Sequence, residues 1–393
     1  MNYFQKRYRI VSQLLLLILI GCQSPDSISG RIENAPKDSK IYLIKPGNLR
    51  SVAAPYFGTV VDSASIFSNG DFNFSDMPEI KTSELFELAV QPQGKAPNYL
   101  KTENPLEANF MPIVLEPGSH VSIYSDWFQF QKRYSIKMPS KNNKALLKLR
   151  DINVQAFKTY LNNKNWHVED GSELLAKEKA LLNYQKALMN FANETKELLP
   201  ALVALRWVSP ENDYERVPEF LVEQCKSRKK NYPEHPWVKE LCEMASPENL
   251  PVLVGSTFPN LKLPLISGDT LDIKTMMGKK LTIVDLWASW CAPCRKENRE
   301  ILVPLWDKYH DQGLNIIAYG LESDLSYWKT AAERDGADRW FQASDLQGDD
   351  ADFLKKIRVQ TIPANFILDA EGMVIAKNLH GKALEHLVNT YFE

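Results

Sequence analysis

The chain has 393 residues, of which 44% are hydrophobic and 24% are charged, and its formal net charge is −2 at pH 7. This length exceeds one ordinary hydrophobic core, so we expect two or three folded units. The balanced charge offers no basic surface for nucleic acid, and we exclude that class of partner.

The first residues have the pattern of an export signal. Three basic residues within the first nine positions precede an apolar stretch over residues 10–20, which is shorter than the roughly 20 residues that span a bilayer. The letters LIGC at 19–22 resemble a bacterial lipobox, in which cleavage leaves Cys22 as a lipid-modified N-terminus. Residues 1–21 are therefore predicted to be a lipoprotein signal peptide. The alternative is an ordinary signal peptide with an incidental cysteine.

A lipid anchor on Cys22 implies an exported protein. Several acyl chains hold a protein stably on a membrane, and the rest of the chain would then lie in an oxidising compartment. Gln23 follows the cysteine, as in lipoproteins that are passed on to the outer membrane. We expect a location in the cell envelope, on the outer membrane and facing the periplasm.

Residues 28–127 show short alternating apolar runs separated by turn residues. Asn69-Gly70, ahead of the alternating Phe72 and Phe74, is a strong hairpin signal. This region is predicted to be a small antiparallel β domain, and nothing in it points to catalysis.

Residues 140–245 change to a helical period. Apolar residues recur at that spacing, for example at Leu146, Leu149, Ile152, Val154 and Phe157. We expect several amphipathic helices that act as a spacer or packing module. Cys225 and Cys242 lie in this region, and they either form a disulfide in an oxidising compartment or remain buried thiols.

A run of prolines with Gly255 between residues 245 and 264 marks a domain boundary. Beyond it, strand and helix patterns alternate. Strands are expected at 281–287, 314–321, 364–368 and 373–376, and helices at 294–309, 325–335 and 382–392. This alternation predicts a partly parallel sheet with helices on both faces.

The sequence WCAPC at 290–294 places Cys291 and Cys294 three positions apart, where the strand pattern gives way to the helix pattern. A zinc site needs four ligands, and the chain has no second CxxC and no nearby histidine pair. A structural disulfide across so short a loop would stabilise the fold little. A redox-active dithiol is the interpretation that remains.

The spacing suits thiol chemistry. Cys291 at the start of a helix faces unpaired backbone N–H groups and the positive end of the helix dipole, which favour its thiolate. Cys294 lies on the same face, one turn deeper and within disulfide reach. Pro293 fits the first turn, where a missing N–H costs nothing. We predict that Cys291 attacks and that Cys294 resolves.

The letters WASWCAPCRKE at 287–297, followed later by TIP at 361–363, resemble the thioredoxin superfamily and, within it, the TlpA/ResA-like exported thiol:disulfide oxidoreductases. The resemblance covers residues 255–393. It implies an α/β thioredoxin-like C-terminal domain over 252–393, preceded by the small antiparallel β domain and the helical region. Phrases such as SGRIENAP also resemble the β domain that often precedes thioredoxin domains in lipoproteins of the Bacteroidetes type.

In that family the proline matching Pro363 is cis and lies against the disulfide, where it helps to bind the extended substrate backbone. An ordinary trans proline is the alternative that the frequencies of X-Pro bonds favour. The resemblance implies a substrate-binding surface formed by Trp290, Ala292, Pro293, Ile362 and Pro363.

Two carboxylates accompany the cysteines. Asp285 precedes Cys291 by six residues and matches the buried acid of thioredoxin that exchanges protons with the resolving cysteine. Strand alternation leaves open whether it faces solvent instead. Glu297 follows Cys294 by three residues and matches a glutamate that ResA-like proteins carry near the site. A solvated helix glutamate is its alternative.

The sequence departs from the family pattern in two places. Ala292 stands where thioredoxin has glycine, so a redox potential cannot be transferred. The proline often found five residues after the second cysteine is absent, since Arg299 stands there and Pro304 lies farther along. The kink of this helix is therefore left open.

The expected function is that of a membrane-anchored thiol:disulfide oxidoreductase that reduces disulfides of exported proteins. Its partners would be exported protein thiols and disulfides, the membrane through the lipid anchor, and an unidentified electron donor. We expect no cofactor and no metal. A peroxidase of the same fold would want Thr or Ser three residues before its cysteine, where Ala288 stands. A non-enzymatic binding lipoprotein with an idle dithiol is a further alternative.

Overall fold

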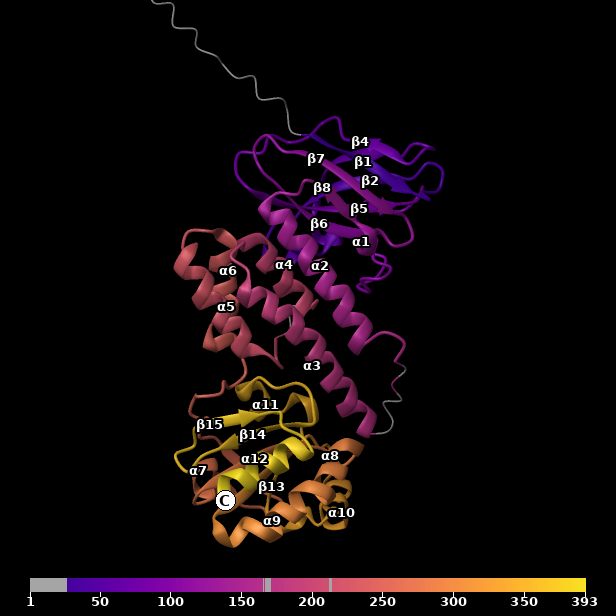
Figure 1. The fold of residues 1–393 in the computed structure, drawn as a ribbon. Coiled ribbons are helices and arrows are strands. Elements are labelled where there is room, and N and C mark those ends of the chain that lie inside the picture. Colours follow the sequence, from indigo (N-terminus) through magenta and orange to yellow (C-terminus); the bar gives the residue numbers. More distant parts are fainter. Residues whose placement is uncertain (1–26, 165, 167–170, 212–213) are drawn as a thin grey trace, which may run out of the picture.

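The computed structural model describes residues 27–164, 166, 171–211 and 214–393, and the predicted signal peptide and Cys22 lie outside these residues. Three parts follow one another along the length of the molecule: a β domain, a helical region and a C-terminal α/β domain (Figure 1). No helix in the described part of the chain is long and apolar enough to cross a membrane.

The β domain consists of two four-stranded sheets. The first has the order β4-β1-β7-β8 and is formed by β1 (Ser27–Glu33), β4 (Asp71–Asn73), β7 (His120–Asp126) and β8 (Ser135–Lys137). The second has the order β3-β2-β5-β6 and is formed by β2 (Lys40–Lys45), β3 (Thr59–Ser65), β5 (Glu84–Gln91) and β6 (Phe110–Leu115). A short helix, α1 (Phe130–Arg133), precedes β8.

The predicted antiparallel pairing is confirmed except for one parallel pair, and the hairpin predicted at Asn69-Gly70 does not form, because the strands on either side of the turn do not pair with each other. β1 pairs with β7 in parallel, while the other pairings in both sheets are antiparallel. The expected turn forms at Asn69-Gly70, where the N–H of Gly70 donates to Phe67 O at 2.8 Å. The strands that it joins, β3 and β4, nevertheless lie in different sheets. A local turn signal does not reveal which strand a segment will pair with.

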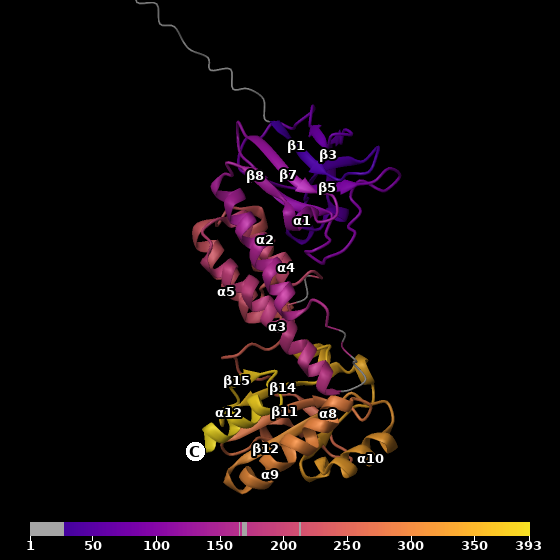
Figure 2. The same cartoon turned by 45° about the vertical axis from the view of Figure 1, so that its right-hand side comes forward.

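The helical region packs on the β domain through one continuous hydrophobic core. It consists of α2 (Lys141–Tyr160), α3 (Gly171–Glu194), α4 (Leu198–Val208), α5 (Pro218–Asn231) and α6 (Pro236–Met244). Cys225 and Cys242 form a disulfide between α5 and α6, so the first of the two alternatives for these cysteines is realised. α3 is longer than its neighbours, and both views show its lower end reaching α8 of the C-terminal domain (Figure 2).

The C-terminal domain contains a five-stranded sheet of order β13-β12-β11-β14-β15. Its strands are β11 (Leu281–Trp287), β12 (Leu314–Gly320), β13 (Phe341–Ala343), β14 (Ala364–Leu368) and β15 (Val374–Lys377). The central β11 pairs in parallel with β12 and antiparallel with β14. All seven residues of β11 are buried, because helices cover both faces of the sheet. The expected mixed sheet is confirmed.

The remaining elements surround this sheet. A hairpin of β9 (Lys262–Pro264) and β10 (Thr270–Asp272) lies at its entry. The helices are α7 (Ile273–Met276), α8 (Ala292–Glu297), α9 (Val303–Tyr309), α10 (Leu325–Asp335), α11 (Asp352–Ile357) and α12 (Lys382–Phe392).

The helix expected over 294–309 is not uniform. A π-helical turn over Asn298–Leu302 separates α8 from α9, and Pro304 stands in the first turn of α9. Proline lacks the N–H that an uninterrupted α-helix would use here and crowds the carbonyl four residues earlier. A wider turn ahead of it removes that conflict. The question of the kink is thus answered by this π turn.

Candidate active site

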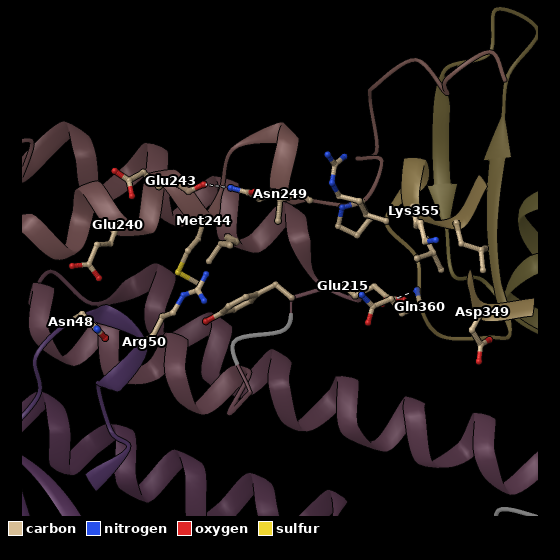
Figure 3. Close-up of a pocket in the computed structure, with 17 residues that line it drawn as sticks. Asn48, Arg50, Glu215, Glu240, Glu243, Met244, Asn249, Asp349, Lys355 and Gln360 are labelled. Carbon is tan, nitrogen blue, oxygen red and sulfur yellow. Dashed lines mark hydrogen bonds between the residues drawn. The ribbon is translucent and has the colours of Figure 1, made fainter. Parts of the chain in front are cut away.

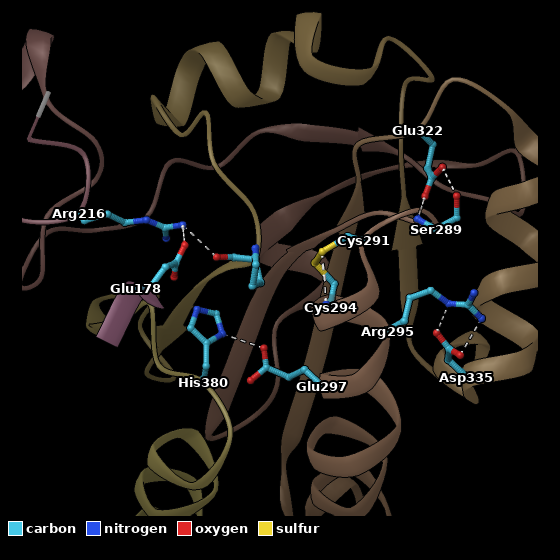
Figure 4. Close-up of a disulfide and its surroundings, with 11 residues drawn as sticks. Glu178, Arg216, Ser289, Cys291, Cys294, Arg295, Glu297, Glu322, Asp335 and His380 are labelled. Atoms are coloured by element: carbon cyan, nitrogen blue, oxygen red, sulfur yellow. Dashed lines mark hydrogen bonds and ion pairs between the residues drawn. A yellow bond between two sulfur atoms is a disulfide. The ribbon is translucent and has the colours of Figure 1, made fainter. Parts of the chain in front are cut away.

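The two cysteines lie where the chain leaves the central strand β11. Cys291 is the N-cap of α8, and its Sγ accepts the N–H of Cys294 at 3.3 Å. The two residues form a disulfide with a Cα–Cα distance of 5.4 Å (Figure 4). The predicted placement at the start of a helix is confirmed. After reduction, the same N–H groups and helix dipole would stabilise a thiolate on Cys291.

Both cysteines have little contact with solvent, since Cys291 is 5% exposed and Cys294 is 2% exposed. Trp290, which precedes them, is 65% exposed. The residue next to Cys291 therefore presents an indole ring at the surface. Trp287 is fully buried and its Nε1 donates to Gln342 Oε1, which assigns it to the core.

Asp285 and Glu297 are both buried, at 4% exposure each. The solvent-facing alternative is therefore wrong for both, because β11, which carries Asp285, is buried along its whole length and the segment around His380 covers Glu297. Burial raises the pKa of Asp285 well above its usual value, and the nearby charge of Glu297 raises it further. Such an acid can accept a proton near neutral pH. The catalytic roles of these two residues stay predictions.

A loop between β15 and α12 fixes the carboxylate of Glu297. Its Oε2 lies 2.8 Å from Nδ1 of His380 (Figure 4). Its Oε1 accepts the N–H of Gly381 at 2.9 Å. These two contacts hold the carboxylate toward the loop rather than toward solvent. The charge that acts on Asp285 is thereby kept in a fixed position.

The peptide bond between Ile362 and Pro363 is cis, as the resemblance implied. Pro363 is buried and Ile362 is half-buried, and the two residues immediately precede β14. Of the other residues expected to face substrate, Ala292 is exposed, whereas Pro293 is buried in the first turn of α8. The structure therefore places Pro293 in the start of the helix and not on an exposed surface that a substrate could contact.

Comparison with known proteins places residues 253–389 in the family described as Redoxin. The chain is 26% identical over 141 residues to the thiol-disulfide oxidoreductase ResA of Bacillus thuringiensis, covering 36% of this chain and 77% of that protein. It is 27% identical over 132 residues to the thiol:disulfide interchange protein DsbE of Pseudomonas fluorescens, covering 33% of this chain and 68% of that protein.

Among solved structures, the thioredoxin domain of a thiol-disulfide oxidoreductase from Bacteroides vulgatus matches with 28% identity and a TM-score of 0.33. The match covers 36% of this chain and 99% of that chain. The C-terminal domain is a thioredoxin-superfamily domain of the TlpA/ResA type.

Two ion pairs attach α8 and the π turn that follows it to α10. Asp335 is buried, and its carboxylate accepts two hydrogen bonds from Arg295, at 2.8 and 2.9 Å, and one from Arg299 at 2.6 Å. Arg299 lies in the π turn itself. Charge-assisted and two-pronged pairs of this kind are among the stronger hydrogen bonds in proteins, so they hold α8 and the π turn in place.

A second buried acid holds the loop before the cysteines. Glu322, two residues after the end of β12, is 2% exposed. Its carboxylate accepts the N–H of Ser289 at 2.5 Å and the hydroxyl of Ser289 at 2.8 Å. Burial raises the pKa of Glu322 above its usual value. The loop that carries Trp290 is thus fixed to the neighbouring strand.

Sequence reasoning did not find His380, Glu322 or Asp335. Each lies far from the CxxC motif in the chain, and none belongs to a short pattern with a known role. Only the pairing of β11 with β12, and the return of the chain after β15, bring them to the site.

Proposed function

We propose that this protein is a thiol:disulfide oxidoreductase of the cell envelope that reduces disulfides of exported proteins. The observation that carries the proposal is the Cys291–Cys294 disulfide at a helix start, in one domain with cis Pro363 and the buried Asp285. The names of the relatives ResA and DsbE support the same chemistry. A lipid on Cys22 would anchor the protein to the outer membrane, facing the periplasm.

The reaction begins with the reduced dithiol. The Cys291 thiolate attacks one sulfur of a substrate disulfide, the substrate S–S bond breaks, and its second sulfur leaves as a thiolate that takes up a proton. Cys294 then gives its proton to Asp285 and attacks the Cys291 sulfur. The mixed disulfide breaks, the second substrate thiol is released, and the Cys291–Cys294 disulfide remains with the two electrons transferred. A donor of two electrons must reduce it again.

Trapping by a Cys294→Ser variant tests the proposal, because the mixed disulfide then has no resolving thiol. We expect this variant, expressed in the envelope, to accumulate covalent adducts that dithiothreitol releases. Mass spectrometry should identify the captured chains as exported proteins with cysteines. The matched control is the double variant Cys291→Ser/Cys294→Ser, which should form no adducts. An equal yield from both variants would contradict the proposed exchange.

The location is tested by a Cys22→Ala variant. Without the acyl chains the protein loses the hydrophobic anchor that several chains provide. We expect the wild-type protein to sediment with the outer-membrane fraction. The variant should appear in the soluble periplasmic fraction or keep its signal peptide. Metabolic labelling with a fatty acid should mark the wild type only. Labelling of both proteins would contradict lipidation at Cys22.

A further inference from the structure

Two consecutive residues of the helical region, Glu215 and Arg216, contact the loop that carries the cis proline. We name the segment Gln360–Pro363 the proline loop. The carboxylate of Glu215 accepts the N–H of Gln360 at 3.1 Å, the N–H of Thr361 at 3.2 Å and the hydroxyl of Thr361 at 2.7 Å. Figure 3 shows Glu215 beside Gln360 among the residues that line a cavity of about 1280 Å³, to which all three parts of the molecule contribute.

Arg216 holds the other end of the proline loop. Its guanidinium donates to the carbonyl of Pro363 at 3.2 Å and to Oδ1 of Asn378 at 3.0 Å. It also pairs with Glu178 of α3 at 3.2 Å (Figure 4). Arginine presents several donors in a rigid planar arrangement, so it can satisfy three acceptors in one orientation. Its side chain is 27% exposed, which limits screening by water.

These contacts leave one residue of the proline loop open for pairing. Within the described part of the chain, the N–H and C=O of Ile362 take part in no hydrogen bond. An extended peptide pairs with every second residue of an exposed edge through both backbone groups. Pairing at Ile362 would next involve Gln360, but the N–H of Gln360 already binds Glu215. The exposed edge is therefore one residue long.

We propose that Glu215 and Arg216 form a clamp that positions the proline loop and restricts substrate pairing to Ile362. The inference rests on the proposed function and extends the site by two residues from outside the thioredoxin-like domain. The clamp residues are positioning residues, since they act through the loop.

The test compares two disulfide substrates for each variant of the full chain. Insulin offers a polypeptide backbone beside its disulfide, whereas 5,5′-dithiobis(2-nitrobenzoic acid) has none. We expect Glu215→Gln and Arg216→Gln to lower the ratio of kcat/KM for insulin to kcat/KM for the small disulfide by about tenfold, because misplacing a substrate-binding group lowers productive binding. The loss should lie mainly in KM. Arg216→Lys keeps the charge without the planar fork and should recover part of the ratio.

Glu219→Gln is the matched control. Glu219 also joins the helical region to the thioredoxin-like domain, through Lys377 at 2.7 Å and the N–H of Val254 at 3.0 Å, but it does not contact the proline loop. It should leave the ratio at the wild-type value. An unchanged ratio in both clamp variants, or an equal fall in Glu219→Gln, overturns the clamp.

Hydrogen exchange gives a readout that does not depend on turnover. The N–H groups of Gln360 and Thr361 should exchange faster in Glu215→Gln than in the wild type, and unchanged protection would also overturn the clamp. Failure of the wild type to reduce either disulfide would instead refute the proposed function.

Discussion

A Cys291→Ser variant is expected to lose disulfide reduction, with the rate on insulin lowered by at least about 1,000-fold. The serine hydroxyl is of similar size but is not ionised near neutral pH, so the helix start has no anion to stabilise. None of the other cysteines in the described part of the chain can take its place, because Cys294 is 2% exposed and Cys225 and Cys242 are bonded to each other. Insulin reduction with dithiothreitol as the electron donor measures the loss.

The matched control for this variant removes the other disulfide. Cys225 and Cys242 join α5 to α6 in the helical region, away from the active site. A Cys225→Ser/Cys242→Ser variant should keep insulin reduction, although it should unfold at a lower temperature because the unfolded chain regains the freedom of a closed loop. Substantial activity in Cys291→Ser, or loss of activity in the control while that variant is still folded, would show that Cys291 and Cys294 are not the reacting pair.

The elements with strong local periodicity were predictable from the sequence. The bounds of β11, α10 and α12 agree with the structure to the residue, because each has a clear start or stop signal and a regular apolar pattern. The placement of Cys291 at the helix start followed from the same boundary. For these elements the local sequence pattern was sufficient, because neighbouring residues determine where each one begins and ends.

Features that depend on distant segments were not predictable. The alternation of β11 could not tell whether Asp285 is buried, because a strand covered on both faces buries every residue. The parallel pairing of β1 with β7 joins segments from opposite ends of the β domain. The π turn before Pro304 depends on how a helix accommodates proline once α8 is held against α10.

The helical region was expected to be a spacer or packing module, and its contacts show a closer relation to the active site. α3 lies against α8, and Arg216 reaches the carbonyl of Pro363. These contacts join residues more than a hundred positions apart in the chain. Amphipathic periodicity predicts that such helices exist and which face they bury, but it does not predict which domain they will bind.

Replacing Asp285 with asparagine is expected to slow the resolution of the mixed disulfide by about 10- to 100-fold at pH 8, because an amide cannot accept the proton of Cys294. The wild-type rate should fall as the pH drops through the raised pKa of Asp285, since the protonated carboxyl is no longer a base. Asp285→Asn should lack this acid limb. Stopped-flow tryptophan fluorescence from pH 5 to 9 measures both rates. Glu297→Gln should move the limb to lower pH, because one cause of the raised pKa of Asp285 is then removed.

The stability of Asp285→Asn separates a lost proton acceptor from a damaged fold. In the wild type the folded-state pKa of Asp285 lies above the unfolded value. The unfolded chain therefore ionises first as the pH rises, and the free energy of unfolding falls from the unfolded pKa up to the folded one. Asparagine removes this loss. The variant should be more stable than the wild type at pH 8, and this advantage should be smaller or absent at pH 4. A variant that is slow and also less stable at pH 8 would mean that Asp285 supports the fold and does not serve as the base.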